Sequence, residues 1–473
     1  MANHSEIKFG TDGWRGIIAW DFTFQNVRIA AQAIADIIRE DHPRPEDAAK
    51  FNVFVTYDRR FNSDLFAQNI AQILRANKIG TVISETPLPT PAASLMTKEK
   101  FGMAIMVTAS HNPFQYNGIK IKVEGRSAPD ALTNSIERML GHTAPIMLHT
   151  LPLTAKDEMP AYLSYVKSKF DVKKLAANMK HPVVIDYMYG SAAGIIETLI
   201  PSKKLTAIRT VHDPLFGGIN PEPVESNLAE LKKAVKENKA AAGIALDGDG
   251  DRVGIIDDRG AYLTPCQIYP IIVDYLVNRQ KKKGKILQSV SMGYLAKRIA
   301  KENGLAYEEA PVGFKYIAEK ILAEDVLAGA EESGGYAWKG TLPDRDGVMT
   351  ALLLIQIMQE TGKSLSELIA DIEKKYGKSV FLRKDLKLKS PIPDKKSFAE
   401  KMIKKLPKKV NGAPITETPA TDGLKILLGN GNWMLIRPSG TEPVMRIYAE
   451  SPALKETEAL LDFAEKLVAK QIQ

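Results

Sequence analysis

Short apolar runs alternate with amphipathic stretches along most of the chain. Residues 51–58, FNVFVTYD, have the aromatic and β-branched composition of a strand. Residues 63–77 place Leu65, Ile70 and Ile73 at the spacing of one helical face. Further strands are expected at residues 81–85, 103–110, 181–190 and 240–250. This repeated alternation predicts an α/β architecture with mostly parallel sheets.

Turn-rich and proline-rich segments interrupt the pattern at residues 141–160, 257–260 and 376–393. A chain of 473 residues is also too long for a single hydrophobic core. We therefore predict four domains. Three are α/β domains and the last is a shorter C-terminal unit, with boundaries at residues 1–155, 156–258, 259–376 and 377–473.

The overall composition is that of an ordinary soluble protein, with 44% apolar and 25% charged residues. The longest nearly continuous apolar run, at residues 351–358, is far shorter than the roughly 20 residues that span a bilayer. The first ten residues contain no apolar segment of a secretory signal. The single cysteine, Cys266, excludes an internal disulfide. We expect a cytoplasmic protein without membrane contact.

The net charge of +8 is modest for this length. Much of it lies in residues 279–285, RQKKKGK, and in residues 404–409. We interpret the first run as a helix C-terminus followed by Gly284 as the C′ residue. No aromatic residues interleave with these lysines, so nucleic acid is not an expected partner. Small anionic substrates suit a basic protein.

Three aspartates, Asp247, Asp249 and Asp251, alternate with glycines directly after an apolar run. Carboxylates this close repel one another and require a cation, and oxygen ligands favour Mg²⁺ or Ca²⁺. An EF-hand is excluded because Arg252 stands where its loop needs glycine, and Asp258 where it needs glutamate. A purely structural acidic turn remains the alternative. Arg252 is placed to hold a phosphate beside the metal.

A second candidate site is residues 436–451, IRPSGTEPVMRIYAES, near the C-terminus. Its Arg437, Ser439, Gly440 and Thr441 supply a guanidinium, two hydroxyls and flexible backbone amides, which suit a phosphate dianion. A serine- and glycine-rich surface turn is the competing interpretation.

Three further segments carry polar side chains among glycines. Glu331 and Ser333 in AEESGGYAWKG offer an acceptor and a hydroxyl that suit sugar hydroxyl groups. Lys315 follows a glycine turn and can reach a phosphate, although a solvated lysine is the default interpretation. The N-terminal FGTDGWRG places Arg15 in a glycine-rich loop that we expect to face the same site.

The segment VTASHNPFQYNGIK, residues 107–120, raises the question whether its serine is a catalytic nucleophile. Ser110 and His111 are adjacent in the chain, and adjacent side chains seldom point at each other, so a nucleophile–base dyad is unfavourable. No GxSxG elbow surrounds the serine. Ser110 is therefore not expected to be an acyl-transfer nucleophile.

Taken together, TASHNP, DGDGDR, EESG and RPSGTEP closely resemble the loops of the α-D-phosphohexomutase superfamily, the phosphoglucomutase/phosphomannomutase enzymes. The resemblance covers essentially the whole chain, in the same order. It implies three related α/β/α domains with mixed sheets and a C-terminal α+β domain that resembles the TATA-binding-protein fold. Each domain would contribute one loop.

The resemblance implies a role for each loop. Ser110 would carry a phosphoryl group, with Mg²⁺ held by its phosphate and by the three aspartates. The enzyme would interconvert hexose 1-phosphate and hexose 6-phosphate of glucose or mannose, through a bound 1,6-bisphosphate that turns end for end. Glucose 1,6-bisphosphate would act as activator and intermediate. The groups expected to move protons are Arg15, His111 and Lys120, and for His111 a hydrogen bond that orders the loop is the alternative. The substrate-binding residues would be Arg252, Lys315, Glu331, Ser333, Arg437, Ser439, Gly440 and Thr441.

Other activities stay open at this point. A glucose 1,6-bisphosphate synthase would use the same residues and release the intermediate. A phosphoglucosamine mutase is another member of the superfamily, but many of these carry histidine where this chain has Tyr336. The family also usually has glycine where this chain has Ala330. A non-catalytic sugar-phosphate-binding protein is the alternative outside the class. The chain is expected to be a monomer or homodimer.

Overall fold

The computed structural model describes residues 7–10, 12–42, 44–145, 151–439 and 443–472. They form two compact units. The first contains Met1–Leu263, Gly313–Glu324 and Ser333–Ser366, and the second contains Thr264–Val312, Asp325–Glu332 and Glu367–Gln473.

The first unit begins with a mixed seven-stranded sheet of order β1-β5-β4-β2-β3-β7, with β6 beside β5. Its strands are β1 (Trp14–Ile17), β2 (Val53–Tyr57), β3 (Thr81–Ser84), β4 (Met103–Val107), β5 (Tyr116–Val123), β6 (Arg126–Ser127) and β7 (Thr154–Lys156). Strands β2, β3, β4 and β7 are parallel, whereas β5 is antiparallel to both β1 and β4.

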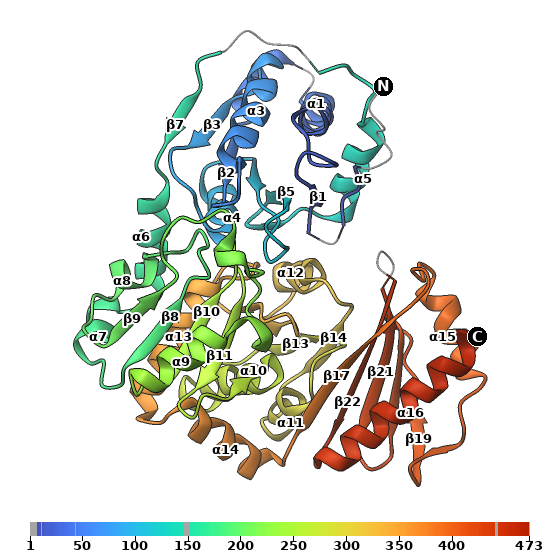
Figure 1. Ribbon diagram of the computed structural model, residues 1–473. Coiled ribbons are helices and arrows are strands. Elements are labelled where there is room, and N and C mark those ends of the chain that lie inside the picture. Colours follow the sequence, from blue (N-terminus) through green and yellow to red (C-terminus); the bar gives the residue numbers. More distant parts are fainter. Residues whose placement is uncertain (1–6, 11, 43, 146–150, 440–442, 473) are drawn as a thin grey trace. The chain divides into compact units, whose positions relative to one another are not determined.

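Five helices accompany this sheet, and α1 and α3 pack against each other over its core (Figure 1). The helices are α1 (Phe24–Asp41), α2 (Pro45–Lys50), α3 (Ser63–Ala76), α4 (Thr90–Glu99) and α5 (Asp130–Met139). Ile70 and Ile73 of α3 are buried as predicted, but Leu65 is exposed. The buried face of α3 is instead continued by Phe66, whose ring packs on Phe22 and Phe24.

A second sheet of order β12-β11-β10-β8-β9 follows in the same unit. Its strands are β8 (Val183–Asp186), β9 (Leu205–Ile208), β10 (Ala242–Leu246), β11 (Val253–Asp257) and β12 (Tyr262–Leu263). The accompanying helices are α6 (Met159–Lys169), α7 (Val172–Ala177), α8 (Ile195–Leu199) and α9 (Ala229–Glu237), with short turns η2 (Phe216–Gly218) and η3 (Glu225–Asn227). The turn at residues 257–260 is a hairpin inside this sheet, because β12 pairs with β11.

Three further elements complete the first unit: α12 (Phe314–Ala323), β16 (Tyr336–Trp338) and α13 (Gly347–Thr361). Helix α13 contains the long apolar run, and it is buried along most of its length. Asp346 caps its N-terminus by accepting a hydrogen bond from the amide of Met349. Within the described ranges, no helix combines the length and apolar character that crossing a bilayer requires.

The second unit contains parallel strands β13 (Lys285–Ser289), β14 (Tyr307–Ala310) and β15 (Val326–Ala330), with β13 between the other two. Helix α10 (Pro265–Asp274) runs into a π-helical turn, η4 (Tyr275–Arg279), and α11 (Leu295–Glu302) follows β13. The prediction that Gly284 is a helix C′ residue is wrong. The helical segment ends at Arg279, and Gly284 precedes β13, where a side chain would lie 2.8 Å from the backbone nitrogen of Leu327.

A six-stranded antiparallel sheet of order β17-β22-β21-β20-β19-β18 forms the C-terminal part. Its strands are β17 (Val380–Lys387), β18 (Lys409–Val410), β19 (Ala413–Glu417), β20 (Leu424–Leu428), β21 (Trp433–Pro438) and β22 (Val444–Ser451). The helices are α14 (Leu365–Tyr376), α15 (Lys395–Ile403) and α16 (Leu454–Ile472), and α16 lies along one face of the sheet (Figure 1). The turn-rich boundary segment predicted at residues 376–393 thus includes the edge strand β17. The α/β layers and this C-terminal α+β part confirm the predicted fold class.

Candidate active site

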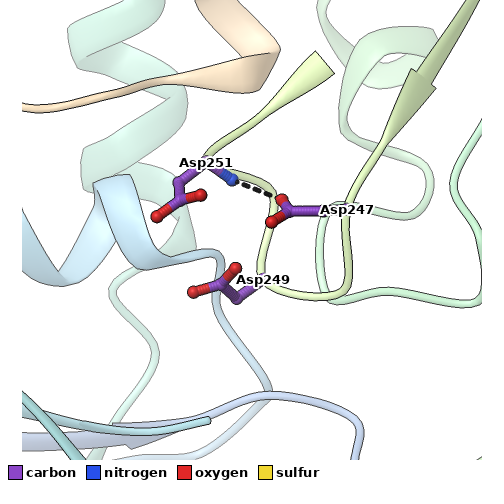
Figure 2. A group of neighbouring side chains, drawn as sticks. All are labelled: Asp247, Asp249 and Asp251. Carbon is purple, nitrogen blue, oxygen red and sulfur yellow. Dashed lines mark hydrogen bonds between the residues drawn. The ribbon is translucent and has the colours of Figure 1, made fainter. Parts of the chain in front are cut away.

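The three predicted metal ligands converge on one point (Figure 2). The loop that carries Asp247, Asp249 and Asp251 connects β10 to β11, and one oxygen from each carboxylate lies within 4.8 Å of the others. All three side chains are buried. Gly250 adopts a φ of +70°, which glycine accommodates without strain. Such a buried carboxylate cluster requires positive charge.

The free oxygens of this cluster fit a hard cation. Oδ1 of Asp249 and Oδ1 of Asp251 are buried without a hydrogen-bond donor among the described residues. Oδ1 of Asp247 accepts hydrogen bonds from the amides of Asp251 and Arg252 at 2.9 and 3.1 Å. Burial, followed by repulsion from Asp249 and Asp251, raises the pKa of Asp247 well above its ordinary value. A divalent cation with oxygen ligands would relieve this repulsion.

Ser110 lies at this cluster. It is fully buried, and its Oγ donates to Oδ2 of Asp247 at 3.1 Å. Its φ of +55° is in the left-handed region, which is unusual for serine and marks a tightly constrained loop. Gly248 permits the close approach, because a side chain at that position would lie 2.5 Å from the carbonyl oxygen of Ser110.

Arg60 binds the backbone of the serine loop, the segment after β4 that carries Ser110. Its Nη2 donates to the carbonyl oxygens of Ser110 and Asn112 at 2.6 and 2.7 Å, and its Nη1 to two further carbonyls, those of Pro113 and Tyr116. Asp58 pairs with this guanidinium at 3.3 Å. Sequence reasoning missed both residues, although the pair stands directly after β2 in TYDRR.

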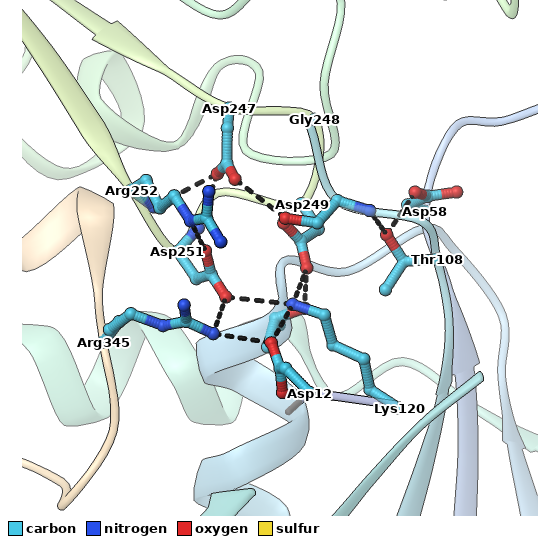
Figure 3. A network of polar contacts seen from close by, with 12 residues as sticks. Asp12, Asp58, Thr108, Lys120, Asp247, Gly248, Asp249, Asp251, Arg252 and Arg345 are labelled. Carbon is cyan, nitrogen blue, oxygen red and sulfur yellow. Dashed lines mark hydrogen bonds and ion pairs between the residues drawn. The ribbon is translucent and has the colours of Figure 1, made fainter. Parts of the chain in front are cut away.

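Lys120 lies on β5 and is buried among carboxylates (Figure 3). Its Nζ is 2.8 Å from Asp249 Oδ2, 3.0 Å from Asp251 Oδ2 and 2.8 Å from Asp12 Oδ2. Burial lowers the pKa of Lys120, but attraction to these three aspartates outweighs burial and raises it above its ordinary value. The side chain is therefore an ammonium ion in this arrangement.

Asp12 and Arg345 extend the network beyond the predicted residues. Nη2 of Arg345 lies 2.6 Å from Asp12 Oδ2 and 2.9 Å from Asp251 Oδ2 (Figure 3). Asp12 belongs to the FGTDGWRG segment, which was identified through Arg15, whereas nothing near Arg345 was identified. Nη1 of Arg15 donates to Oδ1 of Asn112 at 2.6 Å, so Arg15 contacts the loop that carries Ser110.

Four cationic side chains influence the charge state of His111. Burial lowers the pKa of His111 well below its ordinary value, and repulsion from Arg252, Arg15, Lys120 and Arg60 lowers it further. Its Nδ1 is buried without a hydrogen-bond partner in the described part of the chain. Both effects favour the neutral form of the imidazole. Figure 3 shows the Arg252 side chain beside the carboxylate cluster.

Lys315 does not project freely into solvent. It is buried at the start of α12, pairs with Asp130 and lies 5.2 Å from the ring centroid of Tyr316. The default interpretation of a solvated lysine is therefore wrong.

Glu331 and Ser333, the residues predicted to bind sugar hydroxyl groups, follow the end of β15. Glu331 is buried directly after this strand, in the second unit. Ser333 begins the next segment of the first unit and precedes Gly334, whose φ is +87°. A side chain at Gly334 would lie 2.4 Å from the carbonyl oxygen of Val253. This glycine is therefore required for the close approach to β11.

Arg437 and Ser439, which are predicted to bind phosphate, lie in the second unit. Arg437 and Ser439 are buried at the end of β21. Nε of Arg437 donates to Oδ2 of Asp422 at 2.8 Å. Gly440 and Thr441 lie outside the described residues. The structure thus brings together Arg15, Ser110, His111, Lys120, Arg252 and the three aspartates within the first unit, and Arg437 and Ser439 within the second.

Comparisons with known proteins match most of the chain to one family. The phosphoglucomutase/phosphomannomutase models for alpha/beta/alpha domains I, II and III match residues 6–145, 160–260 and 264–376. The model for the C-terminal domain of that family matches residues 388–467.

Similar proteins extend over nearly the full length. A phosphoglucomutase/phosphomannomutase of Thermococcus kodakarensis is 29% identical over 98% of this chain and 99% of its own. A phosphoglucosamine mutase of Caldanaerobacter subterraneus subsp. tengcongensis is 30% identical over 93% of this chain and 94% of its own. The crystal structure of a putative phosphomannomutase from Thermus thermophilus is 30% identical, covers 98% and 99% of the two chains and superposes with a TM-score of 0.85. The chain therefore belongs to the phosphoglucomutase/phosphomannomutase family, within the α-D-phosphohexomutase superfamily of phosphosugar mutases.

Proposed function

We propose that this protein is a phosphohexomutase that interconverts the 1-phosphate and 6-phosphate of glucose or mannose through a phosphorylated Ser110. The observation that carries the proposal is the contact between Ser110 Oγ and Asp247 in a buried carboxylate cluster. A serine beside a potential metal site is suited to phosphoryl transfer, which depends on positioning and on neutralising charge.

The proposed cycle contains two transfers that balance. In the first, the bond between phosphorus and Ser110 Oγ breaks, and a bond forms between phosphorus and the free hydroxyl of the hexose phosphate. The proton of that hydroxyl passes to a neighbouring base. Ser110 Oγ takes up a proton as it leaves. The resulting hexose 1,6-bisphosphate turns end for end. Ser110 Oγ then loses its proton and bonds to the phosphorus of the other phosphoryl group, the bond from that phosphorus to the sugar oxygen breaks, and the sugar oxygen takes up a proton. The isomeric monophosphate leaves.

Asp247, Asp249 and Asp251 would hold Mg²⁺, and they fit it because two of their buried oxygens have no hydrogen-bond donor among the described residues. Bound Mg²⁺ supplies positive charge to the transferring phosphoryl group. Arg252 adds a guanidinium at the same cluster, with its Nε 3.7 Å from Asp251 Oδ1.

Proton transfer would involve Lys120, His111 and Arg15. The ammonium of Lys120 is suited to return a proton to the leaving oxygen, and the neutral imidazole of His111 is suited to accept one. Arg15 orders the serine loop through Asn112.

The remaining loops would bind the far part of the substrate. Arg437 and Ser439, with Gly440 and Thr441, would hold the phosphate that is not being transferred. Glu331 and Ser333 would bind sugar hydroxyl groups, and Lys315 is an additional phosphate contact. We also propose that the domain boundaries lie near the predicted positions.

One other substrate has specific support. Phosphoglucosamine mutase is the name of several relatives of similar identity. Tyr336, where many such enzymes carry histidine, favours glucose or mannose. A glucose 1,6-bisphosphate synthase would share every residue of the site and would differ in releasing the intermediate.

The test is a comparison of kcat/KM for the 1-phosphates of glucose, mannose and glucosamine, with Mg²⁺ and with or without trace glucose 1,6-bisphosphate. The proposal predicts conversion of glucose or mannose 1-phosphate that the bisphosphate stimulates. A higher kcat/KM for glucosamine 1-phosphate would identify the second candidate. Accumulation of bisphosphate in the presence of a phosphoryl donor would identify the synthase.

A further inference from the structure

A second cation shares the carboxylate that binds Arg437. Oδ2 of Asp422 accepts from Nε of Arg437 at 2.8 Å, and Oδ1 of the same carboxylate accepts from Nζ of Lys395 at 2.5 Å. Oδ2 also accepts from the amide of Val312 at 3.0 Å, which fixes the orientation of the carboxylate. Asp422 therefore holds a lysine and an arginine side by side.

Backbone hydrogen bonds place the segment before Lys395 beside Ser439 and Pro443. The amide of Ile392 donates to the carbonyl of Ser439 at 3.2 Å, and the amide of Leu388 donates to the carbonyl of Pro443 at 2.7 Å. These two bonds hold the segment that precedes α15 alongside the end of β21 and the start of β22. The position of Lys395 is thus set by the fold as well as by its ion pair.

Gly423 explains how Asp422 approaches Arg437 so closely. Its φ is +98°, and a side chain there would lie 2.6 Å from the carbonyl oxygen of Ile436 and 2.9 Å from Cα of Arg437. Only glycine accommodates this contact without a shift of the backbone. The Asp422–Gly423 pair therefore acts as a fixed clamp on Arg437.

Two arginines face each other beside this clamp. Arg437 and Arg446 are direct partners across β21 and β22, an arrangement that is unfavourable for like charges. The carboxylate of Asp385 lies 3.9 Å from Arg446 and also accepts two 2.7 Å hydrogen bonds from Arg383. The single carboxylate of Asp422 is shared between Arg437 and Lys395. An anion bound here would relieve the repulsion.

This positive cluster is open to solvent on one side. The side chains of Lys395 and Arg446 are 28% and 25% exposed, whereas that of Arg437 is 9% exposed. A dianion can therefore reach Lys395 from solvent, and Arg437 shares the carboxylate of Asp422 with it.

We propose that Lys395 is a second cationic contact for the substrate phosphate bound by Arg437, and that Asp422 is the positioning residue that holds both cations. This inference rests on the proposed function, in which Arg437 binds the phosphate that is not being transferred. The ligand chemistry is a phosphate dianion, either as part of a hexose phosphate or as free inorganic phosphate.

The first experiment measures binding of inorganic phosphate by calorimetry, which requires no turnover. Lys395→Met keeps the alkyl chain and removes the charge, and Lys396→Met, at the adjacent exposed position of α15, is the matched control. Lys395→Met should weaken binding about tenfold, as expected for one charge-assisted hydrogen bond. The control should match the wild-type protein. Added to Arg437→Met, the Lys395 substitution should have little further effect, because the two residues share one site.

The second experiment measures kinetics with hexose phosphate. Lys395→Met and Asp422→Asn should raise KM about tenfold and leave kcat within about twofold. Asp422→Glu, which retains the charge, should recover part of the lost affinity. A lowered kcat at unchanged KM would assign these residues a structural role and overturn the inference. Asp422→Asn also affects the Val312 contact, so Lys395→Met decides the question if the other variant folds poorly.

The two experiments separate this inference from the proposed function. Phosphate binding that depends on Lys395 and Arg437, in a protein without mutase activity, would support the anion site and reject the mutase. Normal mutase activity with wild-type phosphate binding and KM in Lys395→Met would support the mutase and overturn the inference.

Discussion

Ser110 Oγ lies 3.1 Å from Oδ2 of Asp247, although the two residues are separated by 137 positions in the chain. The contact joins the loop after β4 to the loop after β10. It places a hydroxyl that can carry a phosphoryl group next to a cluster of carboxylates that can hold a divalent cation. The proposed chemistry depends on this contact.

Removing the hydroxyl of Ser110 should abolish turnover. Ser110→Ala is expected to fold, because only one hydrogen bond of its side chain is lost. The intact-mass spectrum of the wild-type protein after incubation with glucose 1,6-bisphosphate should contain an added phosphoryl group that the variant lacks. Ser168→Ala, at an exposed position of α6, is the control and should behave as wild type. Wild-type turnover in Ser110→Ala would reject the phosphoserine.

Removing one carboxylate should weaken metal binding and activity together. Asp249→Asn keeps the size of the side chain and removes a charge, so activity should fall at least about a hundredfold and the Mg²⁺ concentration needed for half activity should rise. Glu237→Gln, at an exposed position of α9, provides the control for loss of one negative charge. Full activity of the wild-type protein in excess EDTA would contradict the metal assignment.

Replacing Lys120 should affect both stability and catalysis. Lys120→Met removes a buried cation that pairs with Asp12 and with the buried carboxylates of Asp249 and Asp251, and losing one partner of a buried ion pair typically costs about 3–5 kcal/mol of unfolding free energy. Turnover should fall about 100-fold or more if the ammonium transfers a proton. Urea unfolding and steady-state kinetics check both expectations, with the exposed Lys173→Met as control. A stable and fully active Lys120→Met protein would remove Lys120 from the mechanism.

Arg60 should control the rate without touching the substrate. Its guanidinium donates to four carbonyl oxygens of the serine loop, a geometry that a lysine cannot reproduce. Arg60→Lys should therefore displace Ser110 and lower kcat by up to about a hundredfold, as small misplacements of reacting groups do. Arg59→Lys, at the adjacent position, is the control, and equal kcat values for the two variants would contradict this role.

Stability should depend on pH through Asp346. Burial raises the pKa of Asp346 to about 7; repulsion from Asp344 adds to the rise, and hydrogen bonds from Met349 and Tyr162 oppose it. The folded state therefore retains a proton that the unfolded chain releases near the ordinary carboxyl pKa. The stability that this group contributes is complete below that ordinary pKa and is lost as the pH rises through about 7.

Asp346→Asn should remove this dependence, because asparagine is neutral and still caps α13. Its unfolding free energy relative to wild type should rise by about 1.4 kcal/mol per pH unit between about pH 5 and pH 7. Urea unfolding across this range measures the difference, and Asp171→Asn at the exposed N-cap of α7 is the control. Parallel stability curves for wild type and Asp346→Asn would contradict the prediction.

The metal and serine loops were predictable because each is a local segment at the end of a strand. Aspartates separated by glycines after β10 indicate a metal site without knowledge of the fold. Arg60, Asp12 and Arg345 could not be assigned in this way, because their importance comes from contacts with residues far away in the chain. Arg345, for example, meets Asp12 across 333 positions.

The sequence did not predict strand β17 or the exposure of Leu65, and the reasons are similar. Strand β17 alternates more and less exposed positions, but its lysines, arginine and aspartate reduce the apolar signal of an edge strand. In α3, Leu65 and Phe66 are both compatible with a helical apolar face, and only packing against Phe22 selects Phe66. Neighbouring apolar residues cannot be ranked without the partner surface.

The most direct test of the central claim follows the phosphoryl group itself. The protein is incubated with glucose 1,6-bisphosphate that carries isotopically labelled phosphate, freed of excess reagent and mixed with unlabelled glucose 1-phosphate. The account predicts label on Ser110 after the first step and label in hexose phosphate after the second. Label that never enters the protein while hexose phosphates interconvert at the wild-type rate would contradict it.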